Sequence, residues 1–132
     1  MTPVEQIRAL YDAFSRGDVP AVTGCFHDNI TWNYPGKPPY AAEAPYIGCD
    51  SIVNNVFVRL ADEFESFQSA PLEFIASGNK VVVICRETGL AKKTGAPFDI
   101  EAVHLWTVEN ERVTAVSVYT DTLQFAKVAG FV

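Results

Sequence analysis

The sequence predicts an α+β domain in which one curved, cone-shaped antiparallel sheet wraps over three helices from the N-terminal half. Three observations carry this prediction. Apolar residues recur at helical spacing in the N-terminal half, and strand-like segments joined by short polar links fill 80–120. The length of 132 residues is close to the commonest domain size and suffices for a proper core. We therefore expect a single domain over residues 1–132.

The first two helices are predicted by their starts and ends. Thr2 is placed to cap the first helix, Pro3 to occupy its first position, and Gly17 to end it. Asp18 is placed to cap a second, shorter helix from Val19 to about Phe26. The first helix carries one apolar stripe: Val4, Ile7, Leu10, Tyr11 and Phe14. Together the two helices form an αα-hairpin.

The middle of the chain predicts two strands, a loop and a helix. Alternation predicts a half-buried strand over 29–34, and a further strand is expected over 67–76. The segment 35–45 has four prolines and a glycine, so it predicts an irregular loop of the kind that often covers a site. A helical stripe predicts the third helix over about 48–64.

The stretch 80–121 predicts an antiparallel meander of three strands, 80–91, 98–109 and 112–120, because its links are too short for a parallel crossover. In the middle strand, alternate positions form an apolar face interrupted by one imidazole: Ile100, Ala102, His104, Trp106 and Val108. The opposite face mixes acids with Val103 and Leu105, which indicates partial cover. A homodimer formed through this outer face is the expected source of that cover.

Composition limits the partners. A net charge of −6 and a pI near 4.8 argue against nucleic acid and anionic membranes, which require basic patches. The three cysteines follow no C-x-x-C spacing, which argues against a disulfide framework and a zinc site. The N-terminus lacks a signal-peptide pattern, no apolar stretch has membrane-spanning length, and a cytoplasmic location is expected. The sequence contains no Gly-rich phosphate loop, and we expect neither a metal nor another cofactor.

Several motifs, taken in order, resemble the SnoaL-like, ketosteroid-isomerase-like branch of the nuclear transport factor 2-like superfamily, and they span nearly the whole chain. They are Leu10-Tyr11-Asp12-Ala13-Phe14 through Gly17-Asp18, Tyr46-Ile47-Gly48, Ala76-Ser77-Gly78-Asn79-Lys80-Val81-Val82-Val83, Thr94-Gly95-Ala96-Pro97-Phe98, His104-Leu105-Trp106-Thr107-Val108 and Tyr119-Thr120-Asp121-Thr122. The resemblance implies a cone-shaped α+β barrel, usually dimeric, with a deep pocket for a small, mostly apolar molecule. Family members include isomerases, polyketide cyclases, epoxide hydrolases and dehydratases, and others only bind.

Carrying the isomerase residues over one by one reveals departures. The position of the family's base aspartate is matched by Tyr34, which removes the proton-abstracting carboxylate. The position of its oxyanion tyrosine is matched by Leu10, with Tyr11 next to it, and that of its protonated aspartate by His104. The resemblance therefore does not imply steroid isomerisation by the same mechanism.

The other two activities carry over only in part. Arg86 matches the arginine of the family's epoxide hydrolases, but Thr88 and Val118 stand where their two acids lie. Asp121 is the nearest match to the late pocket aspartate that SnoaL-type cyclases use as acid and base. The resemblance thus leaves Asp121 as a candidate and gives no support to epoxide opening.

His104 and Asp121 are the candidate catalytic residues. His104 is either a general acid or base in the pocket or a neutral core histidine held by a hydrogen bond. Asp121 either lies beside His104, which requires a bulge or twist to re-aim one of them, or caps the following turn.

The candidate ligand-binding residues are Tyr11, Trp32, Tyr34, Arg86 and Trp106. The rings of Trp32, Tyr34 and Trp106 suit stacking on a flat ligand, and Tyr11 and Tyr34 can donate to a carbonyl or enolate. The alternative for the rings is plain core packing. Arg86 and Glu87 are neighbours on one strand, so only one of them can face the pocket.

Two functions follow from these residues. The first is a cofactor-free isomerase, cyclase or dehydratase acting on a small apolar carbonyl compound, with His104, together with Asp121, moving the proton. The second is binding or sensing of an apolar metabolite in the same cavity without chemistry. The replaced acids favour the second function, and a buried histidine with an acid within reach favours the first.

Overall fold

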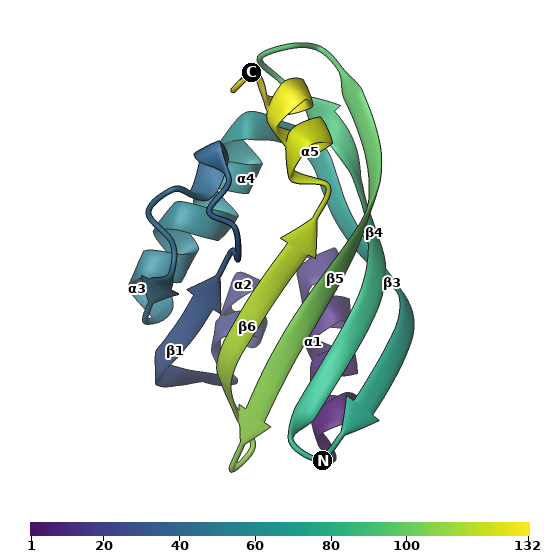
Figure 1. Cartoon of the computed structure of the whole chain (residues 1–132). Helices are drawn as coiled ribbons and strands as arrows, with labels where there is room; N and C mark the ends of the chain where they lie inside the picture. Colours follow the sequence, from purple (N-terminus) through teal and green to yellow (C-terminus); the bar gives the residue numbers. More distant parts are fainter.

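A computed structural model describes residues 1–132 and contains one six-stranded curved sheet with helices on its concave side (Figure 1). The strand order is β2-β1-β6-β5-β4-β3. The strands are β1 (Phe26–Asn33), β2 (Tyr46–Ile47), β3 (Phe64–Ser77), β4 (Lys80–Ala91), β5 (Pro97–Glu109) and β6 (Arg112–Thr120). The predicted α+β class and the meander of β4, β5 and β6 are confirmed.

All strand pairs are antiparallel except that of β1 with β6, which is parallel and pairs Thr31 with Ala115. The β5–β6 link is a two-residue turn in which Asn110 and Glu111 have φ of 50° and 61°. Positive φ at both positions is typical of the type I′ turn, whose twist matches that of the flanking strands. The antiparallel expectation therefore holds for every pair formed by consecutive strands.

Three of the helices begin at side-chain caps, which are Thr2, Asp18 and Asp121. Thr2 Oγ1 accepts from the backbone N–H of Glu5 at 3.2 Å, as predicted for the first helix. The third predicted helix is continuous over 49–63 but contains a π-helical turn, η2. The helical elements are α1 (Pro3–Ser15), α2 (Val19–Thr23), η1 (Pro39–Ala41), α3 (Cys49–Ile52), η2 (Val53–Phe57), α4 (Val58–Glu63) and α5 (Thr122–Ala129).

Several boundaries and three elements differ from the prediction. Strand β3 begins at Phe64 and not at residue 67, and neither η1 nor β2 was predicted. The second helix ends at Thr23, and Phe26 already begins β1, because its ring turns into the core beside Trp32. The C-terminal helix α5 was not predicted. It starts at an Asp121 cap and ends at Gly130, whose φ of 85° suits the left-handed C-terminal position.

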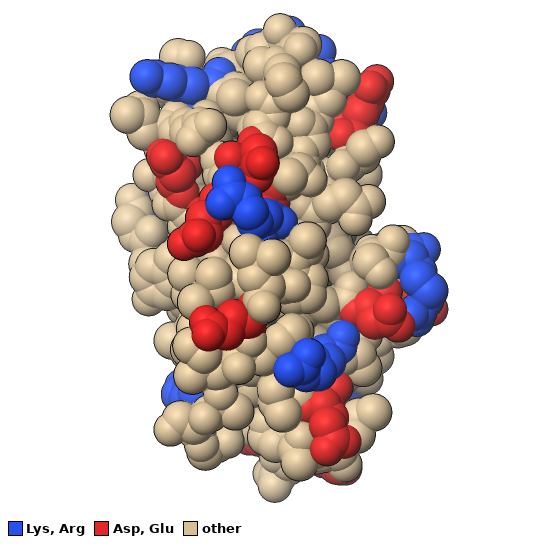
Figure 2. Space-filling view, turned by 90° about the vertical axis from the view of Figure 1, so that its right-hand side faces the viewer, with Lys and Arg blue, Asp and Glu red and all other residues tan.

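The sheet and helices enclose one continuous core. Helix α1 packs on β3 and β4, α3 packs on β1, and α5 packs on the end of β5. On the outer face of the sheet, Val103 and Leu105 are half-buried in the single chain, so the homodimer remains a prediction. Viewed from the side of β3 and β4, acidic and basic side chains lie close together, and neither sign forms a broad patch (Figure 2). No helix combines the length and apolar character needed to cross a bilayer.

Candidate functional site

The concave side of the sheet holds an apolar cavity of about 50 Å³ that opens to solvent at its mouth. Its walls come from α1, the π turn η2 and the inner face of the sheet. Three of the lining residues are polar: Ser69, Glu87 and His104. The others are Leu10, Tyr11, Phe14, Val22, Trp32, Tyr34, Val56, Phe57, Leu60, Phe67, Trp106 and Val118. Such a cavity suits an apolar molecule with few polar groups.

A chain of buried hydrogen bonds crosses the floor of this cavity. The indole Nε1 of Trp106 donates to the hydroxyl oxygen of Tyr11 at 2.9 Å. That oxygen lies 2.5 Å from Nδ1 of His104. The three rings also pack together, with the Tyr11 ring stacked on the imidazole and edge-on to the indole. Tyr11, His104 and Trp106, predicted separately as site residues, are thus brought together by α1 and β5.

Glu87 completes the chain at the other imidazole nitrogen. Its Oε2 lies 3.6 Å from Nε2 of His104, and the two side chains are 10% and 8% exposed. Only one of Arg86 and Glu87 can face the pocket, and Arg86 is the residue predicted there from the sequence. Glu87 has the same parity on β4 as the buried Val81, Val83 and Cys85. Strand pairing fixes this parity, because Glu87 lies opposite Ile100 and Val83 lies opposite His104 on the inner face.

The pKa of His104 is set by competing effects. Burial by itself lowers it, because a buried site disfavours the charged ring. The Tyr11 oxygen, the Cys85 thiol and the Glu87 carboxylate around the ring outweigh burial, so the pKa of His104 lies well above its usual 6.5. The Cys85 thiol and the Glu87 carboxylate thus favour the protonated ring. Both of its nitrogens then donate, Nδ1–H to Tyr11 and Nε2–H toward Glu87.

Protonation of His104 changes what the Tyr11 hydroxyl can do. When His104 is neutral, Tyr11 donates its proton to Nδ1. When His104 is protonated, the Tyr11 oxygen accepts from both Nδ1 and Trp106, and its own O–H is free to donate into the cavity. Burial raises the pKa of Tyr11 and the neighbouring His104 charge opposes that rise, so the phenol keeps its proton at neutral pH.

Trp32 and Tyr34, also predicted from the sequence, line the cavity from β1 and the start of the following loop. Trp32 packs edge-on against both Trp106 and Phe57. Its indole Nε1–H is fully buried and has no hydrogen-bond partner. Burial raises the pKa of Tyr34, and the charge of Arg59 opposes this rise. Both rings are therefore placed to contact a flat ligand.

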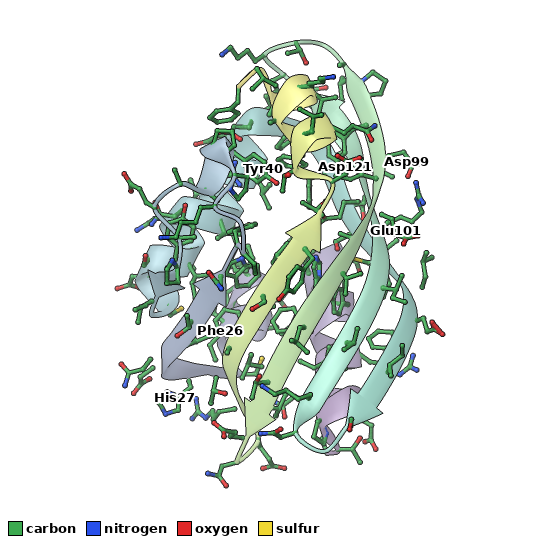
Figure 3. All side chains as sticks on the ribbon, viewed as in Figure 1. Phe26, His27, Tyr40, Asp99, Glu101 and Asp121 are labelled. Carbon is green, nitrogen blue, oxygen red and sulfur yellow. The ribbon has the colours of Figure 1, made fainter.

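Arg86 does not reach the cavity. Its Nε donates to Oδ1 of Asp99 at 2.7 Å, across β4 and β5 on the outer face of the sheet. The reason is strand alternation, since Arg86 has the parity opposite to that of Cys85 and Glu87. Figure 3 shows Asp99 and Glu101 on this outer side. The structure thus corrects the placement of Arg86 as a pocket residue.

Asp121 is not beside His104 either. It is exposed at the junction of β6 and α5 (Figure 3), and its Oδ1 accepts from the backbone N–H of Gln124 at 3.0 Å. The one register shift between β5 and β6 lies at Thr114, and β6 alternates regularly from Ala115 to Thr120, so no bulge re-aims Asp121. The structure therefore places Asp121 as the N-cap of α5 and brings Glu87 to His104 instead.

Replacing Asp121 tests this placement. Asp121→Ala should lower the free energy of unfolding by about 1 kcal/mol, because one N-terminal N–H of α5 loses its partner. Asp121→Asn should retain the cap and the stability. Chemical denaturation measures both, and binding of an apolar probe should be unchanged in both variants. Loss of catalytic activity in Asp121→Asn at full stability would restore Asp121 as a catalytic candidate.

Metal-ligating groups are scattered in this chain. Nowhere do three His, Cys, Asp or Glu side chains gather at ligand spacing. The cavity itself offers one imidazole and one carboxylate, already facing each other. The chemistry that this arrangement supports directly is proton transfer.

Comparison with known families and structures agrees with the fold. The family model described as SnoaL-like domain matches residues 7–116. An NTF2-like protein from Burkholderia thailandensis is 28% identical, with a TM-score of 0.90 over 97% of each chain. No curated protein of known function matches the sequence.

Two further solved structures, at lower identity, share the fold alone. TerC, co-crystallised with polyporic acid, is 24% identical, with a TM-score of 0.87 over 98% of this chain and 99% of its own. A protein with a ketosteroid isomerase-like fold from Catenulispora acidiphila, in complex with trimethylamine, is 18% identical. Its TM-score is 0.79 over 96% of this chain and 92% of its own.

Proposed function

Starting from the fact that the chain belongs to the SnoaL-like domain family, we propose that it is a cofactor-free acid/base catalyst acting on a small apolar carbonyl compound. The reaction is of the isomerase, cyclase or dehydratase type. One observation carries the proposal: a carboxylate and an imidazole, each about a tenth exposed, face each other at 3.6 Å inside a mostly apolar cavity. Buried acid and base pairs of this kind are typical of sites that move protons.

The residues divide the step as follows. The Glu87 carboxylate takes the proton from the carbon next to the carbonyl, and the electron pair of that C–H bond moves to the carbonyl oxygen. The Tyr11 hydroxyl donates a hydrogen bond to this oxygen, and the His104 charge behind it stabilises the enolate. Glu87 and the Tyr11 hydroxyl lie at opposite nitrogens of one imidazole. One carbonyl compound can therefore contact Tyr11 through its oxygen and Glu87 through its neighbouring C–H. Return of the proton from Glu87 to another carbon completes an isomerisation. Attack of the enolate carbon on a second carbonyl, whose oxygen then takes up the proton from Glu87, completes a ring closure.

The test is α-proton exchange of 2-tetralone, a flat bicyclic ketone, followed by proton NMR in D₂O. The protein should accelerate exchange, and His104→Gln should reduce the rate at least about a hundredfold, the scale of losing electrostatic stabilisation of an enolate oxygen. His27→Gln is the matched control, because His27 is the other histidine of the chain and is exposed on β1 (Figure 3). Its rate should equal that of the unmodified protein.

The second candidate function is binding of an apolar metabolite without chemistry. A specific observation favours it, since both His104 nitrogens already have partners inside the protein. In this case 2-tetralone should quench the tryptophan fluorescence without any acceleration of exchange. Polyporic acid, with which TerC was co-crystallised, is a second probe for the binding measurement. Binding without exchange would reject the enzyme and support this alternative.

A further inference from the structure

A second, smaller hollow of about 20 Å³ adjoins the main cavity at Glu87. The two share five lining residues: Tyr34, Leu60, Phe67, Glu87 and Val118. The second hollow adds Tyr40, Arg59, Thr120 and Phe125, which come from η1, α4, β6 and α5. Figure 3 shows Tyr40 at the end of the molecule where the 34–45 loop meets α5. Glu87 therefore stands at the boundary between two compartments.

The second compartment contains two hydroxyls that nothing in the protein satisfies. The hydroxyl of Tyr40, a residue only 6% exposed, and Oγ1 of Thr120 are fully buried and have no hydrogen-bond partner. The chain has one other such side-chain atom, the indole Nε1 of Trp32, and that residue lines the main cavity. All the unpaired buried polar side chains thus border the two compartments. Because buried polar groups are almost always paired, this clustering points to a ligand that supplies the missing acceptors.

The charged groups nearby limit what that acceptor can be. Arg59 is already engaged, with Nη1 on Glu63 Oε2 at 2.9 Å and Nε on the Asn55 carbonyl at 3.2 Å. The Glu87 carboxylate lies on the same wall and repels a second negative charge. An uncharged oxygen, either a carbonyl or a hydroxyl, matches two neutral donors without adding charge.

We propose that the second compartment is a subsite for an uncharged oxygen at the far end of the ligand. The ligand is then an elongated apolar molecule with two oxygen functions, one at Tyr11 and Glu87 and the other at Tyr40 and Thr120. The assignment of the first oxygen as the reacting carbonyl rests on the proposed function. The assignment of the second rests on the unpaired hydroxyls alone.

Two probes differing in one oxygen test the subsite: 2-acetylnaphthalene and 2,6-diacetylnaphthalene. Binding is measured by quenching of Trp32 and Trp106, the two tryptophans of the chain. Tyr40→Phe should weaken binding of the diacetyl compound about fivefold, the usual effect of one neutral hydrogen bond, and leave the monoacetyl compound unchanged. Thr120→Val should act in the same direction. Tyr119→Phe, a tyrosine exposed on the outer face, is the control and should change neither.

The stability of Tyr40→Phe without ligand separates a binding role from a structural one. The variant keeps the ring that packs against Phe125, 4.6 Å between centroids, and removes an unpaired hydroxyl. Its melting temperature should be equal to that of the unmodified protein or higher. A lower melting temperature together with equal loss for both probes would show a hydroxyl held by buried water and overturn the proposal.

Two further outcomes decide the remaining points. Tighter binding of 6-acetyl-2-naphthoic acid than of the diacetyl compound would overturn the uncharged assignment. Tyr40→Phe should also leave the exchange rate of 2-tetralone unchanged, because that ketone has no second oxygen. If Tyr40→Phe selectively weakens binding of the diacetyl compound but the unmodified protein catalyses no exchange, the subsite is supported and the enzyme is rejected. If the protein catalyses exchange and Tyr40→Phe weakens neither probe selectively, the enzyme is supported and the subsite is rejected.

Discussion

Glu87→Gln should remove the catalysed exchange of 2-tetralone, with a rate at least about a hundredfold lower, because glutamine cannot accept the proton. The same variant should be less stable by about 3 kcal/mol at pH 6, where the buried His104 charge loses its carboxylate. Proton NMR of 2-tetralone exchange measures the two rates, and chemical denaturation at several pH values measures the two unfolding free energies, each for the unmodified protein and for Glu87→Gln. Glu101→Gln, an equivalent change on the exposed outer face of β5, should alter neither the rate nor the stability.

The pH dependence of this effect has a definite sign. His104 has a folded-state pKa well above 6.5, so its contribution to stability is complete below the unfolded pKa. It is lost as the pH rises through the folded pKa. The difference in unfolding free energy between the unmodified protein and Glu87→Gln should therefore be largest near pH 6 and shrink in alkaline solution. A difference that grows with pH would contradict a protonated His104.

Tyr11→Phe is expected to be the most damaging single-atom change in the chain. It leaves both the Trp106 indole N–H and Nδ1 of His104 without a partner in a dry environment. Each unpaired buried group costs about 1–3 kcal/mol, so the free energy of unfolding should fall by about 2–5 kcal/mol. The exchange rate should fall as well, because the enolate oxygen loses its donor.

A second tyrosine on the outer face separates this loss from a general effect of the substitution. Tyr119→Phe removes a hydroxyl from an exposed ring and should change stability by no more than about 0.5 kcal/mol. Urea denaturation of both variants provides the comparison. A loss below about 1 kcal/mol in Tyr11→Phe would mean that water replaces the hydroxyl. The floor of the cavity would then be wet, contrary to the packing described above.

Most of the fold could be predicted from the sequence because its elements have strong local signals. The edges of β4 and β6 and the start of α1 follow from turn residues, alternation and a cap, all of which act over a few residues. Helix α5 was missed even though Asp121 and Gly130 bracket it. The carboxylate that caps the helix was considered as a site residue or a turn cap, and its helix-start role was not weighed.

The site was less predictable, because it depends on which face of a strand points inward. In β5 the acids on one face made the choice clear, and His104 and Trp106 were placed correctly. In β4 the residues Val82 and Ile84 make the outer face look as apolar as the inner one. Only the partner strand settles the parity of Arg86 and Glu87. Which of the two side chains faces inward depends on a contact between strands, and the pattern of apolar residues within β4 alone does not predict it.

The parallel pairing of β1 with β6 means that the sheet can be completed only late in synthesis of the chain. Strand β1 is synthesised early, yet its neighbour in the sheet is the last strand of the chain. Until β6 emerges, the apolar side of β1 has no partner along that edge, and such unpaired edges are prone to associate with other chains. Pairing over so long a separation also slows folding. The cavity has walls from α1 and from β6, so it forms only after β6 has been synthesised.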